Sequence, residues 1–175
     1  MSINRAVVAL GAVAVVGVAT LGFSIPYAVN AGKPVPNAAV TAGSDWVQAA
    51  PLKACWDKGN ALDSKSQTAC VAALNAELKN NTVHTVPVNA NGTILLNVDK
   101  LAADKGWTAF ALGSTTSTTL VNETKNQAGG PIPVSSLFAA TSTTQATDES
   151  VIRIVVGDGT TKVYGVWQFE LKAKS

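Results

Sequence analysis

The chain has 175 residues, of which 14% are charged and 47% are hydrophobic, and its formal net charge is +2. Charged residues usually make up about a quarter of a soluble domain. The few lysines and arginines here form no cluster, which excludes the basic surface that nucleic-acid-binding proteins need. The length is sufficient for one domain with its own hydrophobic core.

The first predicted element is an apolar segment over residues 6–25, which has no charge and two hydroxyl side chains. As a helix it has a length of about 30 Å, which matches the hydrocarbon thickness of a bilayer. Residues 1–29 are therefore predicted to form an N-terminal transmembrane anchor. Arg5 precedes the segment and, by the positive-inside rule, places the N-terminus in the cytoplasm and the following domain outside.

A cleaved signal peptide is the alternative for this segment, because residues 29–31 place small side chains at both positions that signal peptidase reads. The apolar run is longer than the roughly 7–15-residue core of a signal peptide, which favours a retained anchor. Small side chains would let a retained helix pack closely against other membrane helices. The candidate helix-packing residues are Gly11, Ala14, Gly17 and Gly22.

Two short segments connect the anchor to the cysteines. Residues 30–44 contain two prolines and many small residues without an apolar period, so they are predicted to form an extended stalk. Residues 45–52 are expected to form a short turn of helix that ends at Pro51. The extracytoplasmic domain is therefore predicted to span residues 45–175.

Cys55 and Cys70 are predicted to form a disulfide, because they follow an export signal and the chain offers too few other ligands for a metal site. Asp63 or Ser64 is expected to cap a helix that runs to about Lys79 and carries Cys70. The disulfide would tie the loop around Cys55 to this helix. Closure of a loop of about 15 residues contributes about 3 kcal/mol.

The rest of the domain is predicted to be rich in β-strands. Residues 82–88 and 93–98 flank a turn signal at residues 89–92 and are expected to pair as a hairpin. A second hairpin is predicted for residues 151–156 and 162–171, because glycines in the connecting turn permit positive φ.

Two more elements complete the predicted fold. Residues 99–105 are expected to form a short helix that ends at Gly106, and residues 107–112 alternate as a strand. In the last strand the alternation predicts a single buried face that carries Trp167 and Phe169. The predicted fold class is α+β, with an antiparallel sheet of about five strands and one disulfide-tied helix.

Residues 113–150 have few apolar side chains and are predicted to form a long Ser/Thr-rich loop. A contact with a partner is one interpretation of the apolar residues in this loop, and packing over the sheet is the other. Trp46 and Trp56, near the stalk and the disulfide loop, are further candidates, because an exposed tryptophan suits a protein contact or the membrane interface. The loop's candidates for a partner contact are Ile132, Leu137 and Phe138.

Catalytic and metal-binding signatures are missing from the sequence. His84 is the sole histidine, and Pro87 in the same predicted strand indicates an edge strand rather than an active site. A hydrolase needs a nucleophile, a base and an orienting acid, and the chain has no GxSxG motif. Motifs for haem attachment and phosphate binding are also missing. No catalytic residue, cofactor or metal is predicted, and an exported hydrolase that uses His84 is the least favoured alternative.

The sequence therefore predicts a non-catalytic accessory subunit that crosses the cell membrane once and stabilises a larger membrane complex through its extracytoplasmic domain. Its expected partners are other integral membrane subunits and the lipid bilayer, without nucleic acid or metal. The alternative is a secreted or cell-envelope-associated domain that binds a small ligand or a glycan after the signal peptide is removed.

The layout, an Ala-, Val- and Thr-rich exported domain with one disulfide behind a small-residue anchor, resembles small exported proteins of high-GC Gram-positive bacteria. It is similar, in the order of anchor, stalk and domain, to the single-span accessory subunits of their cytochrome bcc–cytochrome oxidase supercomplex. This resemblance implies a bracing role in a respiratory supercomplex. It transfers no functional residue, because no motif carries it.

Overall fold

The computed structural model describes residues 34–112, 117–139, 148–157 and 162–174. The anchor predicted for residues 1–29 lies outside this part of the chain. Within the described ranges, no helix combines the length and the apolar character needed to cross a membrane. The candidate helix-packing residues also fall outside the described part: Gly11, Ala14, Gly17 and Gly22.

Sheet A is an antiparallel sheet of four strands in the order β2-β1-β4-β7. β1 (Ala38–Ala42) and β2 (Asp45–Ala49) form a hairpin. The hairpin turns at Gly43, whose φ of 62° is open to glycine without strain. β4 (Thr93–Val98) pairs with β1 on one side and with β7 (Ala128–Pro133) on the other.

Sheet B has five strands in the order β3-β9-β8-β5-β6. Its central hairpin joins β8 (Glu149–Gly157) to β9 (Val163–Ala173). β5 (Trp107–Leu112) and β6 (Ser117–Glu123) continue the antiparallel pairing. β3 (His84–Val88) runs parallel to β9 at the opposite edge.

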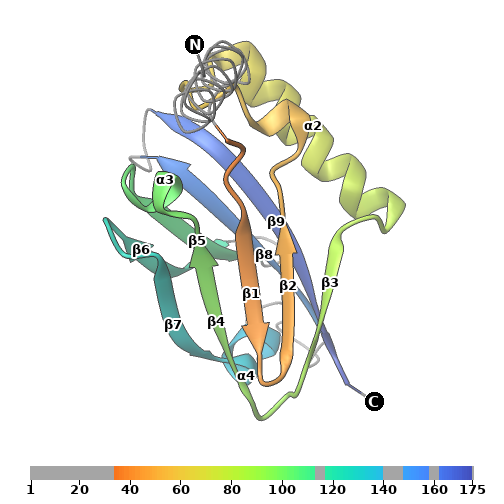
Figure 1. Ribbon diagram of the computed structural model, residues 1–175. Helices are drawn as coiled ribbons and strands as arrows, with labels where there is room; N and C mark the ends of the chain where they lie inside the picture. Colours follow the sequence, from red (N-terminus) through yellow and green to blue (C-terminus); the bar gives the residue numbers. More distant parts are fainter. Residues whose placement is uncertain (1–33, 113–116, 140–147, 158–161, 175) are drawn as a thin grey trace, which may run out of the picture. The chain divides into compact units, whose positions relative to one another are not determined.

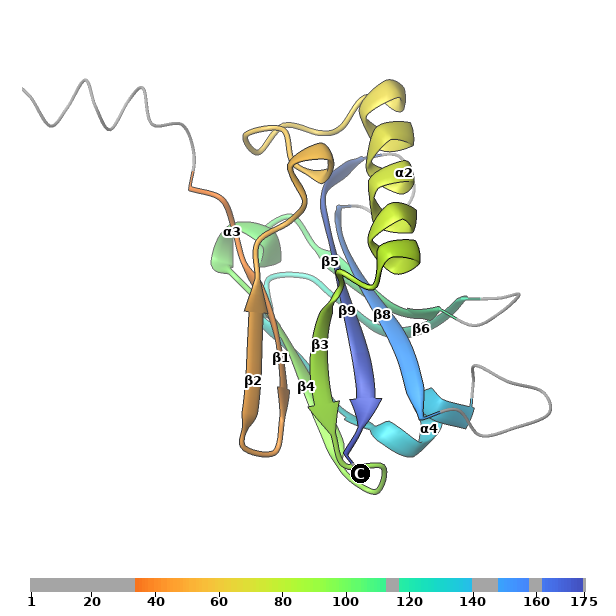
Figure 2. The same ribbon diagram turned by 90° about the vertical axis from the view of Figure 1, so that its right-hand side faces the viewer.

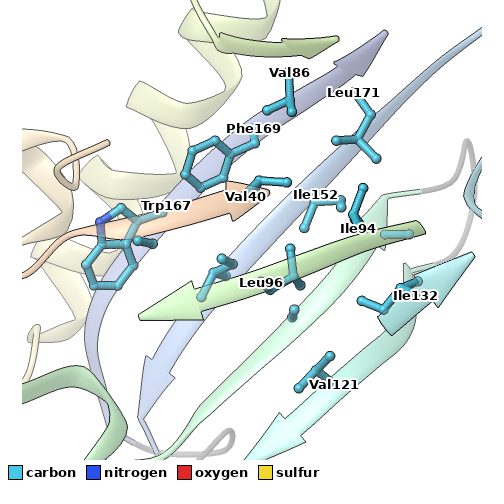
Figure 3. Packing of buried hydrophobic residues seen from close by; sticks show 14 of the residues in the cluster. Val40, Val86, Ile94, Leu96, Val121, Ile132, Ile152, Trp167, Phe169 and Leu171 are labelled. Carbon is cyan, nitrogen blue, oxygen red and sulfur yellow. The ribbon is translucent and has the colours of Figure 1, made fainter. Parts of the chain in front are cut away.

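The two sheets lie face to face (Figure 1), and one hydrophobic core contains side chains from both. Alternation along each strand turns one set of side chains inward. Figure 3 shows Val40 and Leu96 of sheet A approaching Ile152 and Phe169 of sheet B, and all four are fully buried. At the margins β2 lies beside β3 and β6 lies beside β7, so the two sheets enclose the core as a flattened sandwich.

Helix α2 (Ser64–Asn80) covers the outer face of sheet B along β9 (Figure 2). It begins as predicted, because the Asp63 carboxylate accepts a hydrogen bond of 2.7 Å from the Ser66 N–H. It ends where Asn81 adopts a left-handed conformation. The predicted disulfide is confirmed and ties Cys70 of this helix to Cys55 in the 3-10 turn η1 (Lys53–Cys55).

The first correction concerns the residues before the disulfide. The extended stalk was expected to continue to residue 44, yet residues 38–42 form β1, and Val40 is fully buried. Residues 45–49 form β2 instead of a turn of helix. Both differences have the same cause. The side chains of β1 are small and apolar, and β1 therefore fits between β2 and β4. Local preferences for helix or linker do not reveal this pairing.

The second correction concerns the first predicted hairpin and the single predicted sheet. Strands are present near residues 82–88 and 93–98, but β3 belongs to sheet B and β4 to sheet A. The turn over residues 89–92 is formed, with the Gly92 N–H donating to the Asn89 carbonyl at 2.8 Å. It carries the chain from one sheet to the other, so the domain has two sheets, one of them with a parallel pair.

The third correction concerns the long loop predicted for residues 113–150. Its described residues contain β6, β7 and the helix α4 (Val134–Ala139). Ile132, Leu137 and Phe138 are all buried in the main core. Packing, the alternative for these side chains, is confirmed, and burial leaves them without a surface to offer a partner.

Two further predictions concern the short helix before Gly106 and the buried face of β9. The short helix α3 (Lys100–Ala103) is present and ends before Gly106, whose φ is 82°. β9 was expected to have one buried face, and Trp167 does lie in the core. The opposite face is also covered, because α2 packs over Val166 and Gln168, which are 6% and 4% exposed.

Candidate functional site

The two candidate tryptophans occupy different environments. Trp46 projects from β2 on the outer face of sheet A, where 60% of its surface is exposed. Trp56 is half-buried beside Gly165, with which it forms an isolated β-bridge. Of these two tryptophans, Trp46 is the one that presents a large aromatic surface to solvent, and it marks the strongest candidate site.

An open groove of about 200 Å³ lies next to Trp46 on the outer face of sheet A. The strand register explains its shape. Ala39 of β1 stands between Gln48 of β2 and Asn97 of β4, so a methyl group forms the floor and two longer side chains form the walls. We call this the Trp46 groove; its lining residues are Asn37, Ala38, Ala39, Trp46, Gln48, Asn97, Val98, Asp99 and Gln127.

One end of the Trp46 groove is fixed by a reciprocal pair of hydrogen bonds. The Asn37 N–H donates to Oδ2 of Asp99 at 2.7 Å, and the Asp99 N–H donates to the Asn37 carbonyl at 3.0 Å. These bonds fasten the segment before β1 to the start of α3. The groove is therefore built on sheet strands and on a tied segment, which gives it a preformed shape.

Besides Asn37, three side-chain amides from separate segments line the groove. Gln48, Asn97 and Gln127 come from β2, from β4 and from the residue before β7. The described residues offer no hydrogen-bond partner to these three side-chain amides. Each amide has a donor group and an acceptor group. The groove can therefore exchange hydrogen bonds with a neutral polar ligand.

An apolar strip borders the same groove. Thr41 lies in register between Trp46 on β2 and Leu95 on β4. Leu95 is 42% exposed, so the outer face of sheet A carries an aromatic and an aliphatic side chain across one strand. Such an arrangement offers a flat apolar contact beside the amides.

His84 remains apart from any such cluster. It is exposed at the start of β3, and β3 is the edge strand that Pro87 predicted. Burial raises the pKa of Glu77, and the charge of His84 acts in the opposite direction. Among the described residues, no group of three His, Cys, Asp or Glu side chains is placed to hold a metal ion.

The amide residues of the groove were missed by the sequence analysis. The signal that would have found one of them, Gln48, is the alternation in β2, which places it with Trp46 on the face opposite Val47. Expecting a helical turn over these residues concealed that pattern. Asn97 and Gln127 join them only through strand register, which the sequence does not reveal.

Comparisons with protein-family models and with curated proteins found no match to this chain.

Proposed function

We propose that this chain is a non-catalytic extracytoplasmic binding domain and that the Trp46 groove binds a glycan of the cell envelope. The observation that carries the proposal is the exposed Trp46 ring beside three side-chain amides that lack partners among the described residues. This is the binding alternative from the sequence, now attached to a particular surface.

A sugar ring has two chemical surfaces that match the groove. Its faces carry C–H groups, which pack against an aromatic ring, and its rim carries hydroxyls, which both donate and accept hydrogen bonds. Trp46 supplies the aromatic contact, whereas Gln48 and Asn97 supply paired donors and acceptors.

The size of the groove fits one ring of this kind. A cavity of about 150 Å³ holds a benzene molecule, and the Trp46 groove measures about 200 Å³. Because the groove is open, neighbouring sugar units can continue along the sheet. An extended polymer therefore suits the groove better than an enclosed small molecule does.

The test measures binding of soluble oligosaccharides, including N-acetylglucosamine oligomers, to the full chain by NMR titration. Trp46→Ala is expected to weaken binding about tenfold, because it removes the apolar surface on which the C–H face of the sugar packs. Trp56→Phe is the matched control and is expected to bind as the wild type does. Equal binding by wild type and Trp46→Ala, or no binding by the wild type, would contradict the proposal.

A second candidate function is the accessory subunit of a membrane complex, with a respiratory supercomplex as its most specific form. The observation that favours it is the exposure of Trp46 and Leu95 on either side of Thr41, because tryptophan is enriched at the centres of protein interfaces. In this case the N-terminal anchor holds the domain at the membrane beside other integral subunits.

The two candidates are separated by which side chains the interaction needs. Mild detergent extraction and native gels would show a higher-mass complex for the accessory subunit, and Leu95→Ala would weaken it more than Gln48→Ala would. Glycan binding has the opposite order, because the amide contributes hydrogen bonds to sugar hydroxyls. A chain that migrates alone at its own mass would count against the accessory role.

A further inference from the structure

A second hollow lies on the other side of the molecule, between α2 and the outer face of sheet B. It measures about 190 Å³. In Figure 2 the helix runs over the neighbouring strands β8 and β9, which form the floor of this hollow. We call it the α2 pocket and consider it independently of the Trp46 groove, with which it shares no lining residue.

The walls of the α2 pocket are predominantly aliphatic. Val155 of β8 and Val166 of β9 are partners in the strand register and form the floor. Leu62 and Leu74 close the sides and are 5% and 1% exposed. Val71 lines the pocket from α2 and is 50% exposed, which places it at the mouth.

A single cation, Arg153 of β8, lines these apolar walls. Its guanidinium has five N–H donors, and the described residues accept from one of them, through Oε1 of Gln168 at 2.7 Å. Its Nε is buried and has no hydrogen-bond partner in the described part of the chain. The described residues also give Arg153 no ion pair.

Gln168 holds the guanidinium in place. Its Nε2 donates to the Leu74 carbonyl of α2 at 3.2 Å, while its Oε1 accepts from Nη2 of Arg153. The amide therefore links the backbone of α2 to the guanidinium of Arg153. A guanidinium that is positioned in this way is prepared for a planar anion, since its donors match the two oxygens of a carboxylate.

A charge in such surroundings favours an anionic ligand. Removing a guanidinium from water is costly unless an opposite charge accompanies it. Burial lowers the pKa of Arg153, which is the effect of that cost. The aliphatic walls, in turn, favour a ligand whose remaining atoms are apolar.

We propose that the α2 pocket binds a monocarboxylate with a short apolar tail. The carboxylate pairs with the Arg153 guanidinium, and the tail lies against Val155, Val166 and Val71. The volume limits the tail: a cavity of about 150 Å³ accommodates a benzene-sized group, so the pocket encloses a chain of about eight atoms. The end of a longer tail extends past Val71 into solvent.

The test is an NMR titration of the full chain with octanoate, in which the methyl signals of Val71, Leu74 and Val155 report binding at the pocket. Octanol has the same tail without the negative charge, and acetate has the charge without the tail. Octanoate is expected to shift these methyl signals and to bind about tenfold more tightly than either, since both parts of the site contribute.

Arg153→Gln removes the cation and keeps a polar side chain, and it is expected to weaken octanoate binding about tenfold or more. Val71→Trp fills the mouth, is compatible with an exposed helix position, and is expected to reduce binding without removing the charge. Trp46→Ala is the control and is expected to bind octanoate as the wild type does, whatever the outcome of the glycan test.

Three results would overturn the proposal. The first is octanol binding as tightly as octanoate, which would leave the arginine without a role. The second is unchanged binding by Arg153→Gln with an unchanged thermal unfolding curve. The third is a wild-type titration in which octanoate does not shift the methyl signals of Val71, Leu74 and Val155. This result would overturn the proposal even if signals elsewhere in the chain shift.

Discussion

The outer faces of the two sheets differ in what covers them. On sheet A the face around Ala39, Thr41 and Trp46 is open, and its hollow is lined by amides. On sheet B the face around Val166 and Gln168 is covered by α2, and its hollow is lined by aliphatic side chains. The helix therefore covers Val155 and Val166 on sheet B, whereas Trp46 and Leu95 on sheet A remain exposed.

The two faces therefore contribute to different properties: the face under α2 to folding stability, and the open face of sheet A to ligand binding. Side chains beneath α2 contribute by burial of apolar area, and the helix is held to η1 by the disulfide. Side chains on the open face of sheet A contribute little to folding and are available for a ligand. We therefore expect substitutions on the two faces to affect different measurements.

The sharpest test of this division is a pair of leucines, one on each outer side. Leu74 of α2 is 1% exposed, whereas Leu95 of β4 is 42% exposed. Leu74→Ala is expected to reduce the free energy of unfolding by about 2–5 kcal/mol, because it leaves a cavity under the helix. Leu95→Ala is expected to change it by at most about 0.5 kcal/mol.

Urea denaturation of both variants and the wild type measures these values. Similar losses for the two leucines would contradict the comparison. A large loss for Leu95→Ala alone would show that the open face of sheet A is packed against another part of the protein.

The disulfide gives the next effect in size. Replacing both Cys55 and Cys70 with serine is expected to lower the free energy of unfolding by about 3 kcal/mol, as loop-closure entropy predicts for a loop of this length. Addition of a reductant should produce the same loss in the wild type and no change in the double variant. Unchanged stability after complete reduction would mean that the packing of α2 alone holds the 3-10 turn.

The smallest effect is a pH dependence at the start of α2. The hydrogen bond from the Ser66 N–H lowers the pKa of the Asp63 carboxyl below its ordinary value of 3.8. Because the pKa is lower in the folded state, the stabilisation is present above the unfolded pKa and is lost as pH falls through the folded value. Asp63→Asn keeps a capping oxygen but removes the titration.

At neutral pH the free energy of unfolding of the wild type should therefore exceed that of Asp63→Asn, and this difference should be smaller at about pH 3. Glu77→Gln is a control for which the expected change in stability at neutral pH has the opposite sign. Burial raises the pKa of Glu77, so its charge opposes folding at neutral pH, and the glutamine variant is expected to be the more stable one there. A wild-type advantage over Asp63→Asn that grows in acid would contradict the cap.

Local signals explain which parts of the fold the sequence predicts. Asp63 and the residues after it define the start of α2, and two glycines close to β8 and β9 define their hairpin. These elements depend on neighbours in the chain, and their prediction is confirmed. The disulfide was predicted because both cysteines follow a predicted export signal and the chain offers too few other metal ligands, and it is confirmed.

Strand partners that are distant in sequence explain the failures. Alternation in β3 identifies a buried face but does not identify β9 as the neighbour. β7 contains Gly129 and Pro131, residues that disfavour strands. Gly129 is nevertheless suited to its place, since a Cβ there would lie 2.5 Å from Cγ1 of Val121.

The candidate site could be predicted only in part from the sequence, because it also depends on strand partners that are distant in the chain. Trp46 is recognisable as a tryptophan near a predicted boundary, but its exposure depends on the face of β2 that meets the core. Gln48, Asn97 and Gln127 line one groove through the pairing of four strands, β2, β1, β4 and β7. No local motif describes such a group.

The position of β9 in sheet B has a consequence for the order of assembly. β9 follows the other described strands in chain order, yet it lies between β3 and β8 and forms part of the surface on which α2 packs. During synthesis from the N-terminus, β3 lacks its hydrogen-bonding neighbour and α2 lacks much of its support until residues 163–173 emerge. The pairing of β3 and the full packing of α2 therefore wait for the last strand, which joins early and late parts of the polypeptide.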